Sequence, residues 1–567
     1  MPLDPDDVRT PPATTDEPTP ADEPGAPIEP EAGLRSATDG SPRGQANHAP
    51  PSAELLELHR VPIEGPAPHP LQARLDAPVD TGMLEPDRGT QTAWMQAASA
   101  FTLELVRTAG ERPAAGLIGA PGRRLAAQAS VPIPERPLEG GVEAAIAKIG
   151  LAMQAGLETT GPGYLAYVPG GGLYATALAN MIADAGNRYT GLSMAAPGCV
   201  RLEQDVLRWL LDEFGYGPEA RGLLTSGGSM ANLSALISAR HHAFADSGDY
   251  SRAIVYTSAQ AHHSIAKAVA MLGIPRANLR AVAVDPLFRL DPAALQRQLD
   301  ADRHQGLRPF CVIASAGTTN TGAIDPLPEL AQICADEDLW LHVDGAYGGC
   351  FQLCASGRAR LRGIELADSI CFDPHKGMFL PYGTGCLMVR DGARLAAAHA
   401  GEAEYLRDFD PSSDPLPSPA DLGPELSRPF RGLRLWLPLM LHGAEAFRSA
   451  LEEKLALAQL CADGLDTRVD AGAPLEIVAR EQLSTLAFRL RKAPKEALED
   501  YNRRNTDLLG RINAGGRTYL SSTLLPTADG PAVTLRVCIL SFRTHRAHIE
   551  ALLEDIDAGL AAESGPN

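Results

Sequence analysis

Short runs of apolar residues alternate with segments of helical spacing through the middle of the chain, from about Val200 to Arg390. RAIVYTS is followed by the helix-like HSIAKAVAMLG and FCVIASAG by PLPELAQICADED, while LWLHVDGA and DSICFDP continue the series of strand-like runs. Alternation of this kind predicts a mainly parallel sheet with helices packed on it. Because ligands collect at the carboxyl ends of strands in such sheets, we expect the functional site at those ends.

The spacing of apolar residues on either side of this region predicts further helices and strands. TAWMQAASAFTLELVRTAG and GGVEAAIAKIGLAMQAGLE predict a helical N-terminal segment over residues 86–175, ahead of a large α/β domain over residues 176–435. Next, LWLPLMLHGAEAFRSALEEKLALAQLCADGL predicts a long helix. Strands in STLAFRLR and AVTLRVCILS and a last helix in HRAHIEALLEDIDAGL then predict a small C-terminal α+β domain over residues 436–567.

Composition narrows the class of protein. Residues 1–85 are rich in Pro, Ala, Asp and Glu and poor in aromatic residues, so we expect a disordered tail, without the basic and apolar stretches of a secretory signal. No segment offers the roughly 18 apolar residues of a membrane span. The formal net charge of -20 argues against nucleic-acid binding. Nine scattered cysteines indicate reduced thiols in a cytoplasmic protein, and Cys350 and Cys354 do not complete a metal site.

The stretch CFDPHKGMF places His375 and Lys376 directly after a strand-like run. The chain prefers arginine, and its lysines are confined to a few positions, which are Lys148, Lys267, Lys376, Lys454, Lys492 and Lys495. Arginine stays charged at any working pH, whereas a partly desolvated lysine can lose its proton and attack a carbonyl carbon. Lys376 is therefore a candidate nucleophile, and a surface lysine at a strand end is the alternative.

Four more polar clusters follow predicted strands. In LLTSGGSMANLSALISAR a glycine turn leads into a helix, so the backbone N–H groups near Gly228 and Ser229 suit a phosphate, although an ordinary capped helix start has the same pattern. SAQAHHSIAKA places His262 and His263 at a strand-to-helix turn, where a histidine is often a helix cap. ASAGTTNTGAIDP supplies small hydroxyl residues. LWLHVDGAYGGC ends in Asp344, a buried carboxylate that needs a cation or a strong donor.

One ligand would satisfy all of these groups, namely a flat ring that bears a phosphate, a basic ring nitrogen and an aldehyde. The helix start would take the phosphate, Asp344 the protonated ring nitrogen, His262 a face of the ring, and Lys376 the aldehyde. That ligand is pyridoxal 5'-phosphate, which withdraws electrons through its protonated ring. A carboxylate beside the ring nitrogen keeps that nitrogen charged.

The ordered motifs TSGGSMAN, AQAHHS, GTTNTGAIDP, HVDGAYGG and DPHK resemble those of the group II pyridoxal-phosphate-dependent amino-acid decarboxylases, the aromatic-amino-acid and glutamate decarboxylase family. The resemblance runs from about Pro162 to beyond Trp436. It implies the fold of aspartate aminotransferase (fold type I) and a homodimer with active sites at the subunit interface, to which residues 86–175 contribute. It also implies Lys376 as the Schiff-base lysine, Asp344 as the partner of the ring nitrogen and His262 as the stacked imidazole.

The same resemblance assigns further cofactor-binding residues. It implies that Gly228, Ser229 and His375 reach the phosphate, while Thr319 and Ala346 line the ring; His263 would be a neighbour only. Lys376 is followed by Gly377 in place of the bulky tryptophan of animal members, which would reshape the floor beneath the cofactor.

The polar stretch GEAEYLRDFDP predicts a mobile loop that closes over the site. Family members carry a Tyr-Leu pair in this loop, and Tyr405 and Leu406 match it. The tyrosine protonates the carbanion left when carbon dioxide departs, and a neutral phenol can supply that proton. Aldehyde synthases of the family replace either this tyrosine or the stacked histidine. Because this chain keeps both, we expect simple decarboxylation, with an aldehyde synthase or an aminotransferase as the alternatives.

The segment GYLAYVPGGGLYATALANMIADAGNRY corresponds to the family's substrate pocket. The resemblance therefore predicts pocket residues at Tyr167, Pro169, Gly170, Thr190 and Leu192. Several of these differ from the residues of aromatic decarboxylases. We find no arginine signature for an acidic side chain, so the expected substrate is an apolar or aromatic L-amino acid.

Overall fold

The computed structural model describes residues 84–245, 248–401 and 416–563. The chain separates into two units, Met1–Glu85 and Pro86–Asn567, and the description below concerns the second. The disordered tail predicted for residues 1–85 thus lies almost wholly outside the described residues and stays a prediction. Within the described residues no helix has both the length and the apolar character needed to span a bilayer.

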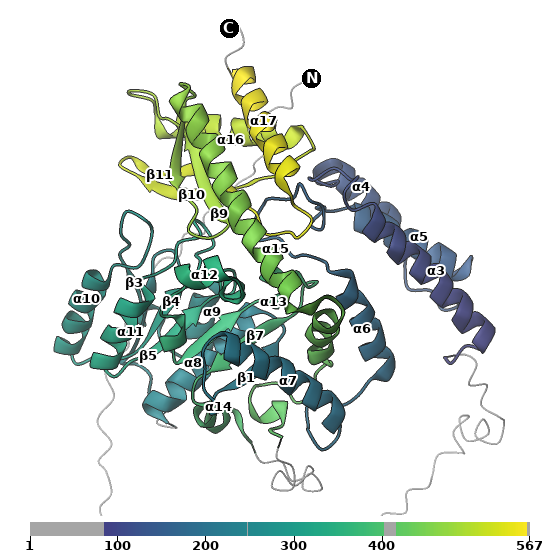
Figure 1. The fold of residues 1–567 in the computed structure, drawn as a ribbon, viewed down its shortest axis with the longest axis horizontal. Coiled ribbons are helices and arrows are strands. Elements are labelled where there is room, and N and C mark those ends of the chain that lie inside the picture. Colours follow the sequence, from purple (N-terminus) through teal and green to yellow (C-terminus); the bar gives the residue numbers. More distant parts are fainter. Residues whose placement is uncertain (1–83, 246–247, 402–415, 564–567) are drawn as a thin grey trace, which may run out of the picture. The chain divides into compact units, whose positions relative to one another are not determined.

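A seven-stranded sheet forms the centre of this unit (Figure 1). Its strand order is β1-β7-β6-β5-β4-β2-β3, in which only β7 runs antiparallel to its neighbours. The mainly parallel sheet predicted from the alternating pattern is confirmed. The strands are β1 Arg221–Thr225, β2 Ala253–Ser258, β3 Leu279–Val282, β4 Arg308–Ser315, β5 Trp340–Asp344, β6 Ser369–Phe372 and β7 Gly385–Val389.

Helices cover both faces of the sheet, which explains why its central strands are apolar on both sides. Alternate residues of β2 belong to two different cores: Ile254 and Tyr256 pack with α7, α10 and α11, whereas Val255 packs with α8, α9 and α14. The helices of this region are α6 Tyr174–Gly186, α7 Pro197–Glu213, α8 Gly228–Phe244, α9 His263–Met271, α10 Pro292–His304, α11 Leu327–Asp336, α12 Ala355–Arg360, α13 Pro374–Gly377 and α14 Gly392–His399.

The predicted N-terminal helices are present as α3 Arg88–Arg107 and α5 Gly141–Gln154, with α4 Gly119–Ala129 between them. Neither α3 nor α5 contains a buried residue. Apolar side chains therefore stay accessible: Trp94 is 48% exposed and Met153 is 58% exposed. Apolar helix faces left open in one subunit are typical of association surfaces.

The C-terminal part combines a four-stranded antiparallel sheet, in the order β10-β11-β9-β8, with two helices. The predicted strands correspond to β9 Thr485–Leu490 and β11 Gly530–Cys538, and the other strands are β8 Leu475–Ala479 and β10 Ser521–Thr527. Helices α16 Leu498–Ala514 and α17 Arg546–Glu563 complete it, so this part has the α+β composition that was predicted, while the predicted domain boundaries stay predictions. The predicted long helix is α15 Arg431–Asp470, which runs across the boundary predicted at residue 435.

Candidate active site

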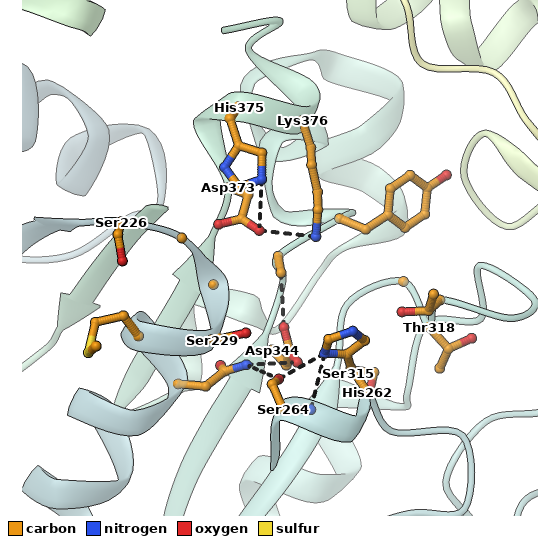
Figure 2. Close-up of a pocket in the computed structure, with 18 residues that line it drawn as sticks. Ser226, Ser229, His262, Ser264, Ser315, Thr318, Asp344, Asp373, His375 and Lys376 are labelled. Atoms are coloured by element: carbon orange, nitrogen blue, oxygen red, sulfur yellow. Dashed lines mark hydrogen bonds and ion pairs between the residues drawn. The ribbon is translucent and has the colours of Figure 1, made fainter. Parts of the chain in front are cut away.

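A cavity of about 310 Å³ lies where the strands β1, β2, β4, β5 and β6 reach their carboxyl ends (Figure 2). The structure places the site where the sheet pattern predicts it. All the residues predicted to bind the cofactor line this cavity, namely Gly228, Ser229, His262, Thr319, Asp344, Ala346, His375 and Lys376.

Lys376 lies in α13, directly after β6, and its amine faces the carboxylate of Asp373, with Nζ 3.0 Å from Oδ2 (Figure 2). Burial on its own lowers the pKa of the Lys376 amine, but Asp373 and then Asp344 more than offset this, so the pKa is raised. Desolvation, from which a deprotonated amine was expected, is thus outweighed by the nearby carboxylates in the chain without its cofactor. The amine is held protonated by an acid from the same DPHK motif.

Exchanging Asp373 for asparagine tests this pairing. Asp373→Asn keeps the size of the side chain but removes the charge that raises the pKa of Lys376. Because only the neutral amine attacks an aldehyde, we expect the pH midpoint of pyridoxal-phosphate loading to fall by about one to three units. Stopped-flow absorbance of the cofactor-free protein across a pH series measures it. Asp212→Asn, which alters an exposed carboxylate paired with Arg208 on α7, is the control, and an unchanged midpoint in Asp373→Asn contradicts the pairing.

Asp344 is the last residue of β5 and is 8% exposed. Its Oδ2 accepts a hydrogen bond from Asn232 Nδ2 at 3.1 Å, and its Oδ1 accepts from the backbone N–H of Ala346 at 3.1 Å and from the Cys371 thiol at 3.3 Å. The donor expected from the sequence is thus present as an amide, a backbone group and a thiol. Among the described residues Asp344 forms no ion pair, which leaves this buried carboxylate open to a cationic ligand.

His262 is half-buried and caps α9, as the alternative interpretation of this histidine allows, and it lines the cavity as well. Its Nδ1 accepts from the backbone N–H of Ser264 at 3.3 Å, and the Ser264 hydroxyl lies 2.8 Å from the same atom. The ring proton is therefore on Nε2. Burial lowers the pKa of His262, although Asp344 opposes the shift, so a neutral imidazole faces the cavity. His263 is exposed and does not line the cavity, in keeping with its expected role as a neighbour.

The part of the cavity at the start of α8 offers donors to an anion. Helix α8 begins there, and the first N–H groups of a helix have no partner within it. His375 closes the same end, and its Nδ1 donates to the Thr384 carbonyl at 2.7 Å. A Cβ on Gly228 would lie 2.9 Å from Asp373 Oδ2 and 3.0 Å from Ala346 Cβ, so only glycine lets the helix start approach this closely.

We expect Gly228→Ala to weaken cofactor binding. The added methyl group pushes the helix start away from Asp373 and Ala346, and overpacking of this kind costs about 1–3 kcal/mol, or roughly 5-fold to 150-fold in affinity. Titration of the cofactor-free protein with pyridoxal phosphate gives the dissociation constant. Gly198→Ala is the matched control, since a Cβ at that position near the start of α7 meets no atom within 4 Å. Equal affinities of the two variants would show that α8 does not hold the phosphate.

The predicted substrate-pocket residues do not line this cavity. Tyr167 is 55% exposed, and Gly170 is buried against the Tyr382 ring and the His375 carbonyl. Thr190 is buried, with its hydroxyl 3.4 Å from the Arg428 carbonyl. Pro169 and Leu192 are likewise buried outside the cavity. None of the five residues therefore lines the cavity beside Lys376 in a single chain, although Gly170 packs against the residue before it. Tyr405 and Leu406 lie outside the described residues.

Several cavity residues are absent from the prediction. They include Ser226, Asn232, Ser264, Ser315, Thr318, Tyr347 and Asp373. Asp373 stands in the DPHK motif, and its distance of three residues from Lys376 on a helical turn was the available signal. Behind the cavity, the buried Arg536 donates to the carbonyls of Thr319, Asn320 and Tyr167 and so fixes the loop after β4. Nothing in the sequence around Arg536 indicates this role.

Close packing explains why a glycine follows the lysine, at position 377. A Cβ at this position would lie 2.4 Å from Cys350 Cβ, so this fold has no room for the bulky residue that animal family members carry after the lysine. Cys350 itself is fully buried, and its thiol lies 3.7 Å from the Asp373 carbonyl. The floor below Lys376 is thus built from a glycine and a cysteine that fit one another.

Comparison with known proteins agrees with this site. The profile of the pyridoxal-dependent decarboxylase conserved domain matches residues 129–491. An aromatic-L-amino-acid decarboxylase of Bacillus atrophaeus is 36% identical over 397 residues, which cover 70% of this chain and 81% of that protein. A phenylacetaldehyde synthase of Arabidopsis thaliana is 30% identical over 400 residues, covering 69% and 80%. The crystal structure of Oryza sativa TDC with PLP and tryptamine superposes with a TM-score of 0.77 at 25% identity, covering 85% of this chain and 99% of that one.

The chain therefore belongs to the family of pyridoxal-dependent decarboxylases. It is an amino-acid decarboxylase of fold type I, and its cofactor is pyridoxal 5'-phosphate.

The cavity itself fits this cofactor. It joins a helix start that begins with glycine, an amine, a neutral imidazole and a buried carboxylate that has no cation among the described residues. The Oδ1 atom of Asp373 is buried at the same place and has no hydrogen-bond partner among the described residues. An unpaired buried acceptor is costly, which is consistent with a site completed by a polar ligand.

Proposed function

We propose that this protein decarboxylates an aromatic L-amino acid to the corresponding amine, in a cavity where Lys376, Asp344, His262 and the start of α8 meet. The observation that carries this proposal is the convergence of these groups from separate strands on one cavity. Together these residues supply a group for each part of pyridoxal phosphate: its aldehyde, its ring nitrogen, a face of its ring and its phosphate.

Each residue has a distinct task in this proposal. The start of α8, with Ser229 and His375, binds the phosphate, and Lys376 provides the amine that bonds to the aldehyde. Thr319 and Ala346 line the ring. The bound cofactor supplies a protonated ring that accepts the electrons of the broken bond. Asp344 holds the proton at the ring nitrogen through Oδ2, and His262 covers one face of the ring as a neutral imidazole and excludes water there.

An aromatic substrate is supported by the composition of the cavity. Among the described lining residues there is no arginine, so nothing offers the bidentate contact that an acidic side chain needs. Aromatic decarboxylases recur among the similar proteins reported above. Tyr167, Pro169, Gly170, Thr190 and Leu192 are proposed to contact the substrate side chain.

A homodimer completes this pocket in the proposal. Thr190 and Leu192 do not line the cavity of their own chain, and they would reach the substrate only from a second copy. The open apolar faces of α3 and α5 support such an association. Sedimentation velocity of the purified protein tests it, and a monomer that keeps full activity would contradict it.

Tyr405 is proposed to return the proton to the substrate carbon. The test of the whole reaction is a product analysis with each proteinogenic amino acid, in which amine, carbon dioxide, ammonia and hydrogen peroxide are measured together. Amine and carbon dioxide in equal amounts, with an aromatic substrate preferred, support the proposal. Ammonia and peroxide in equal amounts with carbon dioxide would identify an aldehyde synthase instead, which the similarity to the Arabidopsis synthase keeps as the second candidate.

A further inference from the structure

A continuous chain of buried hydrogen bonds runs behind Asp344, away from the cavity. Trp340 Nε1 lies 2.8 Å from Ser369 Oγ, which in turn lies 2.8 Å from His342 Nδ1. His342 Nε2 lies 2.8 Å from Asn232 Oδ1, and Asn232 Nδ2 lies 3.1 Å from Asp344 Oδ2. None of the five side chains is more than 8% exposed.

The strand geometry explains how these residues meet. Trp340, His342 and Asp344 are alternate residues of β5, so their side chains point to the same face of the sheet. Ser369 on β6 stands directly opposite His342 in the strand register, and α8 covers this face and places Asn232 between His342 and Asp344. The polar groups therefore form one line across the sheet.

The carboxylate of Asp344 fixes the direction of the hydrogen bonds in this line. A carboxylate only accepts, so the amide nitrogen of Asn232 donates to it and the amide oxygen of Asn232 faces His342. That oxygen accepts from His342 Nε2–H, and in a neutral ring Nδ1 then accepts from the Ser369 O–H, whose oxygen accepts from Trp340 Nε1–H. All donors point toward Asp344.

The protonation state of His342 agrees with this order. Complete burial lowers the pKa of His342 to about 4, despite the opposing effect of Asp344, so the ring is neutral at working pH. A neutral ring with a fixed tautomer accepts a hydrogen bond at Nδ1 and donates one at Nε2, so it continues the line of hydrogen bonds without adding a charge. Hydrogen bonds aligned in this way polarise one another in a medium of low dielectric constant.

We propose that Trp340, Ser369, His342 and Asn232 form a positioning relay that fixes the orientation of Asp344 and its role as an acceptor for the protonated cofactor ring. This inference rests on the proposed pairing of Asp344 with the ring nitrogen. It assigns a function in the reaction to Trp340 and Ser369, which do not line the cavity. With Oδ1 held by Ala346 and Cys371, and Oδ2 held by Asn232, the carboxylate keeps one orientation at the wall of the cavity.

Replacement of the residues farthest from the cofactor gives the sharpest test. Trp340→Phe removes only the donor that starts the relay, and Ser369→Ala removes its second link. We expect kcat of the holoenzyme to fall a few-fold in Trp340→Phe and about ten-fold in Ser369→Ala, while KM stays unchanged. Losses of about this size in kcat are usual when a residue that supports a functional group from behind is removed. The visible absorbance of the bound cofactor should shift in the same order, because ring protonation is loosened. Ser238→Ala, which removes a buried hydroxyl from α8 without touching the relay, is the control.

The outcomes separate the relay from the proposed function. A wild-type protein without cofactor absorbance would defeat the proposed function itself. Wild-type absorbance together with variants that match Ser238→Ala in kcat and spectrum would overturn the relay alone. Nitrogen NMR of the wild-type holoenzyme adds a readout that needs no variant: His342 with its proton on Nε2 supports the relay, and a proton on Nδ1 overturns it.

Discussion

Replacing Lys376 by alanine is expected to abolish decarboxylation, with kcat reduced by about three orders of magnitude or more. Lys376 is the one lysine that lines the cavity in the part of the chain that the structure describes. Lys454, a fully buried lysine, is engaged in the C-terminal part of the chain by Glu453 and the Thr544 carbonyl. Among the described residues no second amine is therefore placed to bond to the cofactor aldehyde.

A second variant tests whether the reaction needs the Lys376 amine as a nucleophile or only a positive charge at that position. Lys376→Arg keeps a cation beside Asp373 but has no amine that can lose its proton, so we expect it to be as inactive as Lys376→Ala. Carbon dioxide release measures the loss, and mass spectrometry after borohydride reduction shows whether the cofactor is covalently attached. Lys267→Ala, which changes an exposed lysine on the neighbouring helix α9, should behave as wild type. Covalent cofactor that persists in Lys376→Ala would mean that another amine holds it.

The sheet and its site could be predicted from the sequence because both follow from short-range patterns. The parallel strands are buried on both faces, so each reads as an apolar run, and every run ends at the same edge of the sheet. Polar residues directly after such runs, such as His262, Asp344 and Lys376, therefore had to lie near one another. The alternation of strand and helix was sufficient to bring them to one cavity.

The partners of these residues could not be predicted, because they depend on register and on helix placement. Ser369 meets His342 only because β5 and β6 pair with those two residues opposite each other. Asn232 reaches Asp344 from the interior of α8, over a sequence distance of 112 residues, and a helical asparagine carries no local sign of such a partner.

Two local features of the fold could not be predicted from the pattern of apolar residues. The apolar spacing around Gly443 predicts one uninterrupted helix, yet Gly443 adopts φ 72°, a left-handed conformation that breaks α15 into two parts. Strand β10 does not follow from the apolar pattern, because only two of its seven residues are buried and Pro526 lacks the backbone N–H of a strand residue, which is acceptable at the edge of a sheet. Neither feature follows from the periodicity of its segment.

Asp344→Asn is expected to keep the cofactor attached to Lys376 but to lower kcat by about two to three orders of magnitude, the usual cost of removing a preorganised electrostatic stabiliser. The variant has nearly the same volume, so packing around β5 is retained. It lacks the charge that holds a proton on the ring nitrogen. In addition, one of the two oxygens that accept from Asn232, Ala346 and Cys371 becomes an N–H donor, so one of these donors loses its partner.

The contrast with Lys376→Ala makes this prediction specific. In Asp344→Asn, borohydride reduction should still fix the cofactor to Lys376, while the visible spectrum shifts toward that of an unprotonated ring and turnover is lost. Asp338→Asn is a matched isosteric control, because this exposed residue just before β5 has φ 53°, a conformation that asparagine tolerates well. If Asp344→Asn retained both the wild-type spectrum and the wild-type kcat, the ring nitrogen would need a different partner, and the relay behind Asp344 would have no catalytic purpose.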